Sequence, residues 1–193
     1  MKKLFLILFV FSLTASNAQL EKGSKLAGVQ LNLIVNDMYY TKLGFGSSGY
    51  EKYFGVSIAP VYGVAVQRNW IVGGQATLGI ESWKFNAGGS SYTSDNLSTD
   101  LGLAPFTRLY LDITKAGRLK IFGTAAVEFN IASRRTSYPS SVSSGSSSSS
   151  KTTLTPSAGG GIAYFARKIS IDVSMSNTAL RLGVYKVIPY RKK

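Results

Sequence analysis

Apolar and polar residues alternate along residues 54–85, the stretch around which the rest of the chain is organised. Before a tight turn at residues 67–69, the apolar face consists of Phe54, Val56, Ile58, Pro60 and Tyr62. After the turn, the apolar face consists of Trp70, Val72, Ala76, Leu78 and Ile80. A period of two is that of a β-strand. Both strands exceed the usual length of about 5–6 residues and suit a bilayer, which a tilted strand crosses in about 9–11 residues.

The same alternation predicts six further strands, which brings the total to eight. They are expected at residues 25–35, 98–113, 119–132, 153–165, 169–176 and 179–188. Three long connections, at about 36–50, 86–99 and 133–152, alternate with short turns near Arg68, Ala116 and Arg167. Such sorting of loop lengths is typical of outer-membrane barrels. We therefore predict an all-β fold, an eight-stranded antiparallel up-and-down transmembrane β-barrel.

The third long connection is rich in serine and lacks apolar positions that could be buried. Residues 133–152 include the run of five serines that ends at Ser150. Because such a segment has little apolar surface to offset the entropy of ordering, we predict a mobile loop.

The N-terminus has the pattern of a secretory signal peptide. Lys2 and Lys3 precede an apolar run at residues 4–13, and small residues follow up to Ala18. The run is too short for a membrane-spanning helix, which needs about 20 apolar residues. We predict a signal peptide at residues 1–18 and a barrel domain at residues 19–193.

Composition narrows the chemistry that this chain can carry. The sequence has no cysteine and no histidine, so it lacks the thiolate ligands, the commonest metal ligand and the commonest general base. Without Lys2 and Lys3, 20 basic residues face 9 acidic ones. Because a signal peptide directs the chain out of the cytoplasm, an anionic membrane surface is a better partner than nucleic acid. We expect no cofactor, no metal and no enzymatic activity.

Several segments resemble the small outer-membrane barrels of the OmpA/OmpX transmembrane type, often grouped as porin-like. They are SIAPVYG at 57–63, WIVGG at 70–74, LAPFTRLY at 103–110 and LGVY at 182–185. The resemblance implies a Gram-negative outer-membrane location and insertion by the barrel-assembly machinery. Members of this family usually end on an aromatic residue, whereas here Tyr190 is followed by Arg191, Lys192 and Lys193.

Charged residues on the polar faces of the strands form the candidate site. This lumen charge network comprises Glu81, Arg108, Asp112, Lys120, Glu128, Asp172 and Arg181. Eight strands enclose an interior just wide enough for side chains, and isolated buried charges are costly. We therefore predict a plug of paired charges, with Asp172 beside Arg181 and Asp112 beside Lys120. The alternative is a catalytic carboxylate pair formed by Glu81 and Glu128.

Two further groups of residues suggest contacts with the membrane. Lipopolysaccharide phosphates are candidate ligands of Lys42, Arg134, Arg135 and Lys151, although a merely solvated charge cluster explains these residues equally well. The aromatic residues expected in the interfacial girdles are Tyr62, Trp70, Trp83, Phe85, Tyr110 and Tyr164.

The sequence leaves three functions open. The first is an integral outer-membrane barrel with a structural or surface-interaction role. The second is a narrow porin-like pore or a barrel component of a secretion apparatus. The third is a secreted barrel that binds a ligand.

Overall fold

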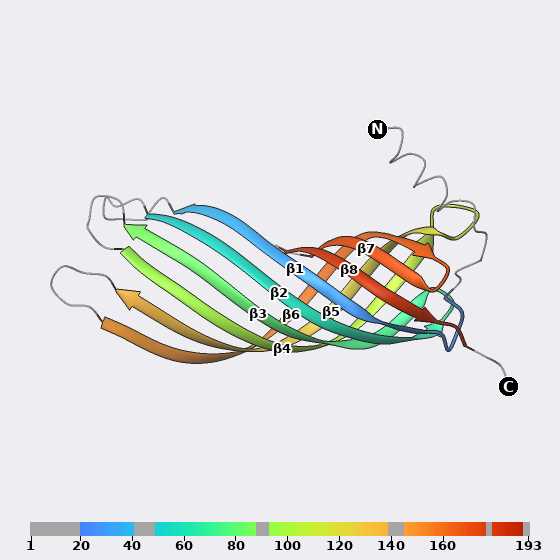
Figure 1. Ribbon diagram of the computed structural model, residues 1–193, viewed down its shortest axis with the longest axis horizontal. Helices are drawn as coiled ribbons and strands as arrows, with labels where there is room; N and C mark the ends of the chain where they lie inside the picture. Colours follow the sequence, from blue (N-terminus) through green and yellow to red (C-terminus); the bar gives the residue numbers. More distant parts are fainter. Residues whose placement is uncertain (1–19, 41–48, 88–92, 139–144, 177–178, 191–193) are drawn as a thin grey trace.

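The computed structural model describes residues 20–40, 49–87, 93–138, 145–176 and 179–190 (Figure 1). The strands are β1 (Lys25–Tyr40), β2 (Gly49–Gln67), β3 (Trp70–Ala87), β4 (Thr93–Asp112), β5 (Leu119–Tyr138), β6 (Gly145–Ala166), β7 (Ile169–Ser176) and β8 (Ala179–Ile188).

The strands close into a ring in which each one pairs with its neighbours along the chain. The order is β1 to β8, and β1 pairs antiparallel with both β2 and β8. The chain is an eight-stranded up-and-down β-barrel. The predicted fold class is therefore confirmed, and the predicted bounds of β7 and β8 coincide with the observed ones.

Apolar side chains cover the outside of the barrel, whereas the inside contains the buried polar side chains together with a group of aromatic ones. Leu78 and Leu103 face outward with 61% and 60% of their surface exposed, whereas Gln30 and Asp172 inside are 0% and 1% exposed. This is the reverse of a water-soluble protein and is the distribution of a transmembrane barrel. Within the described residues, no helix is long and apolar enough to span a membrane.

The two ends of the barrel differ in their connections. At the end that we call the turn end, residues 68–69, 113–118 and 167–168 connect the strands. Asn69 and Gly117 take positive φ angles of 65° and 64°, which asparagine and glycine tolerate better than most residues. The opposite end, where residues 41–48, 88–92, 139–144 and 177–178 connect the strands, is called the loop end.

The predicted long loops are largely strand, which corrects the sequence-based bounds. β1 continues to Tyr40, β3 to Ala87 and β5 to Tyr138, while β6 already begins at Gly145. Pairing uses backbone groups, so serine-rich segments can join the ladder although they lack the apolar alternation by which strands are recognised. Residues 131–138 and 145–152 are therefore paired with each other rather than in a mobile loop. Residues 139–144 lie outside the described part.

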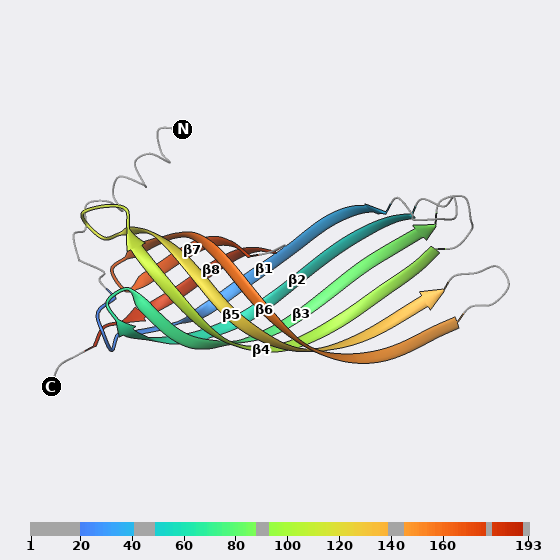
Figure 2. The same ribbon diagram turned by 180° about the vertical axis from the view of Figure 1, so that it is seen from behind.

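The strands have unequal lengths, which leaves two sheet edges open at the loop end. β6 has 22 residues, but β7 and β8 have 8 and 10. As a result, β6 pairs with β7 only over residues 159–166, and β1 pairs with β8 only over residues 25–34. Figures 1 and 2 show the β7–β8 hairpin ending well before the other strands. Residues 145–158 of β6 thus have a described strand on one side only.

Placing a charge on the lipid-facing side tests this orientation of the strands. We expect Leu103→Arg to destabilise the barrel by about 2–4 kcal/mol, because arginine near the bilayer midplane is costly. The matched control is Ser150→Arg, at an exposed serine of the loop-end extension, which should change the free energy of unfolding by less than about 0.5 kcal/mol. Urea unfolding in lipid vesicles measures both, and equal effects would contradict the lipid-facing position of Leu103.

Candidate functional site: the lumen

Aromatic side chains fill the half of the lumen near the turn end. The rings come from β4, β5, β6 and β8 and are those of Phe106, Tyr110, Phe122, Phe165 and Tyr185, each no more than 6% exposed. Tyr110 lies at the centre of this group, with its ring centroid 5.3 Å from that of Phe122 and 5.5 Å from that of Phe165. Such tilted and edge-to-face pairs are the favoured geometry of aromatic contacts.

A buried ion pair crosses the lumen inside this aromatic cluster. Arg108 of β4 donates a hydrogen bond from Nη1 to Oδ2 of Asp172 on β7, at 2.7 Å, and the two side chains are 4% and 0% exposed. The same nitrogen lies 3.2 Å from the hydroxyl of Tyr110, and the guanidinium carbon lies 4.4 Å from the Phe122 ring centroid. The carboxylate and the ring faces offset part of the desolvation cost of the guanidinium.

A second charged pair lies inside the barrel at the turn end itself. Lys120 of β5 is 0% exposed and contacts Asp112, which lies opposite it in the β4–β5 register. Asn69 joins the pair by accepting a hydrogen bond from Lys120 at 3.1 Å and donating one to Asp112 at 3.3 Å. The side chain of Lys120 is thus buried at the turn end between Asn69 and Asp112.

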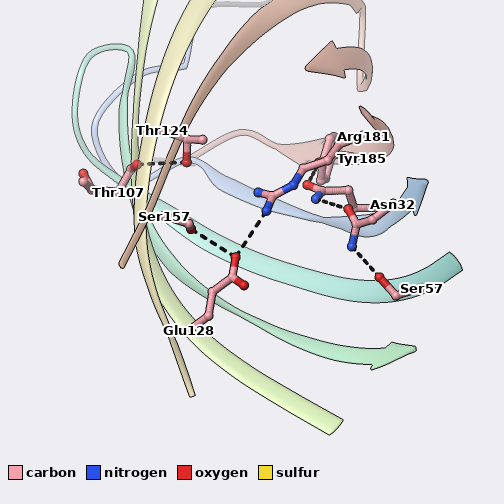
Figure 3. A network of polar contacts seen from close by, with 9 residues as sticks. Asn32, Ser57, Thr107, Thr124, Glu128, Ser157, Arg181 and Tyr185 are labelled. Atoms are coloured by element: carbon pink, nitrogen blue, oxygen red, sulfur yellow. Dashed lines mark hydrogen bonds and ion pairs between the residues drawn. The ribbon is translucent and has the colours of Figure 1, made fainter. Parts of the chain in front are cut away.

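Polar side chains line the middle of the lumen, on the loop-end side of the aromatic cluster. Arg181 points toward Glu128, with 3.2 Å between Nη2 and Oε1, and Ser157 donates a hydrogen bond to the same oxygen at 3.0 Å (Figure 3). A separate chain of hydrogen bonds runs from Asn32 to Ser57 at 2.8 Å and from Gln30 to Asn32 at 2.7 Å. These contacts tie β1, β2, β5, β6 and β8 together through their side chains.

These polar residues border a cavity of about 290 Å³ that is lined by several charged groups. The charged lining residues are Glu81, Asp100, Glu128 and Arg181. The two glutamates that form the candidate catalytic pair both face this cavity, but Glu128 is engaged by Arg181. Among the described residues, no group of histidine, cysteine or carboxylate side chains could hold a metal ion.

The structure pairs two of the predicted lumen residues differently from the sequence-based expectation. Asp172 lies opposite Gly183 and Arg181 opposite Ser174 in the β7–β8 register, so the two are close along the hairpin, as predicted. They nevertheless form ion pairs with Arg108 and Glu128 instead of with each other. The lumen is so narrow that long side chains reach the opposite wall, and a strand register alone does not show this.

Several aromatic residues also lie elsewhere than predicted. Tyr62 and Trp70 are on the outer surface, 50% and 40% exposed, but Tyr110 and Trp83 are buried inside the barrel. Tyr164 is partly buried, and the side chain of Phe85 lies outside the described part. The prediction of Tyr110 as a girdle residue is therefore wrong, because its side chain lies inside the barrel, on the same side of β4 as Arg108.

The sequence analysis did not select Phe122, Phe165 or Tyr185 as lumen residues. A signal was available for Phe122 and Tyr185, because each is separated by an even number of positions from a lumen charge on its own strand. Phe165 has no such charge on its strand, but it follows Ala163, which lies opposite Lys120 and Asp172, by two positions. Phe122, for example, follows Lys120 by two positions, and successive side chains of a strand alternate between faces. Because these rings are apolar, the sequence analysis did not assign them to the lumen-facing side of their strands.

The basic residues selected for lipopolysaccharide contacts do not share one face. Arg134 and Arg135 are adjacent on β5 and therefore point to opposite sides. Arg134 is on the inner side, with its guanidinium carbon 4.2 Å from the ring centroid of Trp83. Lys151, opposite Ala132, is also on the inner side, which leaves Arg135 on the outer one. Lys42 lies outside the described residues.

Comparison with solved structures finds three bacterial proteins that align with most of this chain. Neisserial surface protein A (NspA) is 13% identical, with 88% of this chain and 100% of that chain covered and a TM-score of 0.39. The translocator domain of the autotransporter NalP from Neisseria meningitidis is 9% identical (100% and 84%; TM-score 0.43). Ail, the attachment invasion locus protein of Yersinia pestis, in a complex with the heparin analogue sucrose octasulfate, is 15% identical (86% and 95%; TM-score 0.36).

No protein-family model and no curated protein matches this sequence. Because all three TM-scores are low, the assignment of the fold rests on the strand pairing of the chain itself.

Removing one partner of the buried pair should destabilise the barrel strongly. We expect Arg108→Ala to lower the free energy of unfolding by about 3–5 kcal/mol, because it leaves the Asp172 carboxylate buried without its partner. Replacing both residues, as in Arg108→Met with Asp172→Leu, should restore part of the loss. Arg135→Ala, at an exposed position, is the control and should cost less than about 0.5 kcal/mol. A double variant less stable than Arg108→Ala would contradict the charge-pair explanation.

Proposed function

We propose that this chain is an integral outer-membrane barrel with a structural or surface-interaction role and a lumen closed to ions. The observation that carries the proposal is the closed turn-end half of the lumen, where the Arg108–Asp172 pair lies among buried aromatic rings. The apolar outer surface suits a membrane, and the signal peptide predicted at residues 1–18 provides the route to the outer one.

The packing of the lumen argues for a plug rather than a pore. Arg108, Tyr110 and Lys120 are each no more than 3% exposed, so water does not reach them from either end. An ion passing this region would have to displace several packed rings and separate a buried ion pair. An eight-stranded barrel has little spare interior in which such side chains could be accommodated elsewhere. The cavity lined by Glu81 and Arg181 is therefore a dead-end recess from the loop end.

The extended sheet at the loop end supports a role in surface interaction. A tilted strand crosses a bilayer in about 9–11 residues, whereas β4 and β5 have 20 each and β6 has 22. The loop-end segments of β5 and β6 are polar and mostly exposed, which suits a position outside the membrane. Residues 145–158 of β6 have no described strand on their second side, and an open edge offers backbone N–H and C=O groups to an extended partner segment.

The orientation of the barrel follows from the same asymmetry. Outer-membrane barrels have short periplasmic turns and longer external connections. We therefore place the turn end in the periplasm and the loop end outside. The surface-interaction role requires this orientation, since only the loop end carries the extended sheet (Figure 1).

Cysteine labelling tests the orientation. Single cysteines introduced by Ser147→Cys and Arg68→Cys occupy exposed positions at the loop end and the turn end. We expect a membrane-impermeant maleimide to label the first but not the second in intact cells, and both after lysis. Equal labelling of the two variants in intact cells would overturn the orientation.

Conductance in planar bilayers tests the plug. We expect wild-type protein to give no steady open level, with insertion verified by heat-modifiable mobility of the same reconstituted sample. The absence of current then reflects a closed lumen and not a failure to insert. A large, steady and ion-selective conductance would favour the porin-like pore instead.

A further inference from the structure

A second cavity, of about 490 Å³, lies at the turn end along the seam between β1 and β8. Its lining consists of Gly23, Lys25, Lys168, Lys186, Val187, Ile188, Pro189 and Tyr190. The ring of Tyr190 lies directly over Gly23, where an added Cβ would be only 2.8 Å from a ring carbon. The cavity therefore lies where the segment before β1 and the segment after β8 meet.

Three lysines from separate segments converge on this cavity. Lys25 begins β1, Lys186 belongs to β8, and Lys168 lies in the turn between β6 and β7. The register places Lys186 opposite both Ala27 and Ile169, which brings the three segments side by side. No carboxylate lines the cavity, and none of the three lysines forms an ion pair with a described residue. The site is thus a concentration of uncompensated positive charge.

An apolar stripe on the outer surface leads away from these lysines toward the loop end. The row next to Lys186 consists of Val29, Ile171 and Val184, and the following row consists of Leu31, Val173 and Leu182. These six side chains are between 38% and 51% exposed. Among the described outward-facing residues of β1, β7 and β8, Lys25 and Lys186 are the charged ones, and both lie at the turn end. The lysines therefore lie at the turn-end edge of an apolar surface that continues along β1, β7 and β8 toward the loop end.

We propose that this cavity binds the phosphate of an anionic glycerophospholipid, whose acyl chains lie along the apolar stripe. Lysine ammonium groups bind phosphate as point charges, and tyrosine favours the headgroup level of a membrane, where Tyr190 would lie. The leaflet rests on the proposed function: with the turn end in the periplasm, the bound lipid belongs to the inner leaflet of the outer membrane. The chemical match between the site and the lipid is the same in either orientation.

Binding in detergent micelles tests the site without reference to orientation. The probe is short-chain phosphatidylglycerol, measured by native mass spectrometry of the folded barrel against phosphatidylcholine of equal chain length. The site variant combines Lys25→Gln with Lys186→Gln. The control variant combines Arg68→Gln with Lys115→Gln, which removes the same charge from exposed turn-end positions outside the cavity. We expect the site variant to weaken phosphatidylglycerol binding by about tenfold, since each basic residue near an anionic headgroup adds substantially to binding, and the control to retain it.

Each other outcome overturns the proposal. Equal losses in the two variants would mean diffuse attraction to a basic rim. Equal binding of phosphatidylcholine would mean that the headgroup charge is not recognised. Competition by inorganic phosphate at the same concentration as the lipid would identify free phosphate as the ligand. Since labelling in intact cells tests the orientation separately, a wrong topology and an absent lipid site give different results.

Discussion

Backbone hydrogen bonding in a bilayer requires a closed ring, and every other feature of this protein depends on that closure. A peptide group in the hydrocarbon core has no water to bind, so each N–H and C=O has to find a partner within the protein. Pairing of β1 with β8 over residues 25–34 completes the ring and removes the edges that an open sheet would leave there. Once the ring is closed, the alternation along each strand divides all side chains into a lipid-facing set and a lumen-facing set.

The small radius of an eight-stranded ring then determines what the lumen contains. Side chains from opposite walls meet, so Arg108 on β4 reaches Asp172 on β7 across the interior. The surrounding rings, such as Phe122 at 4.4 Å from the guanidinium carbon, exclude water and also face the cation. A single arrangement of charge and aromatic surface thereby stabilises the barrel and supports the proposal of a closed lumen. Toward the loop end, where aromatic residues give way to Asn32, Glu128 and Arg181, the lumen opens into a polar cavity.

Unequal strand lengths divide the molecule into a membrane part and a projecting part. The 8 and 10 residues of β7 and β8 suffice for about one bilayer crossing, whereas β4, β5 and β6 are roughly twice as long. Ring closure is required only inside the membrane, because water satisfies backbone groups outside it. Water can therefore satisfy the backbone groups on the open edges of β1 and β6 at the loop end, and a partner strand can pair with them there. At the opposite end, the lysines of the β1–β8 seam form the proposed phosphate site.

Period-two alternation in the sequence was sufficient to predict the number of strands, their order and their lipid-facing sides. The free energy of transferring an apolar side chain out of water depends on that side chain alone. The outward positions of Ile58 and Leu103 could therefore be predicted from the alternation of the residues around them. The opposition of Asp112 and Lys120 was also predictable, because a short turn fixes the register of adjacent strands.

Contacts between strands distant in sequence were decided only by the tertiary structure. The partners of Asp172 and Arg181 depend on how eight strands curve around a common axis, which no single hairpin specifies. The extension of β6 through its serines follows from pairing with β5, since backbone groups form the ladder whatever side chains they carry. The seam cavity arises only when the two ends of the chain are brought together, so Lys25 and Lys186, far apart in sequence, become neighbours through ring closure.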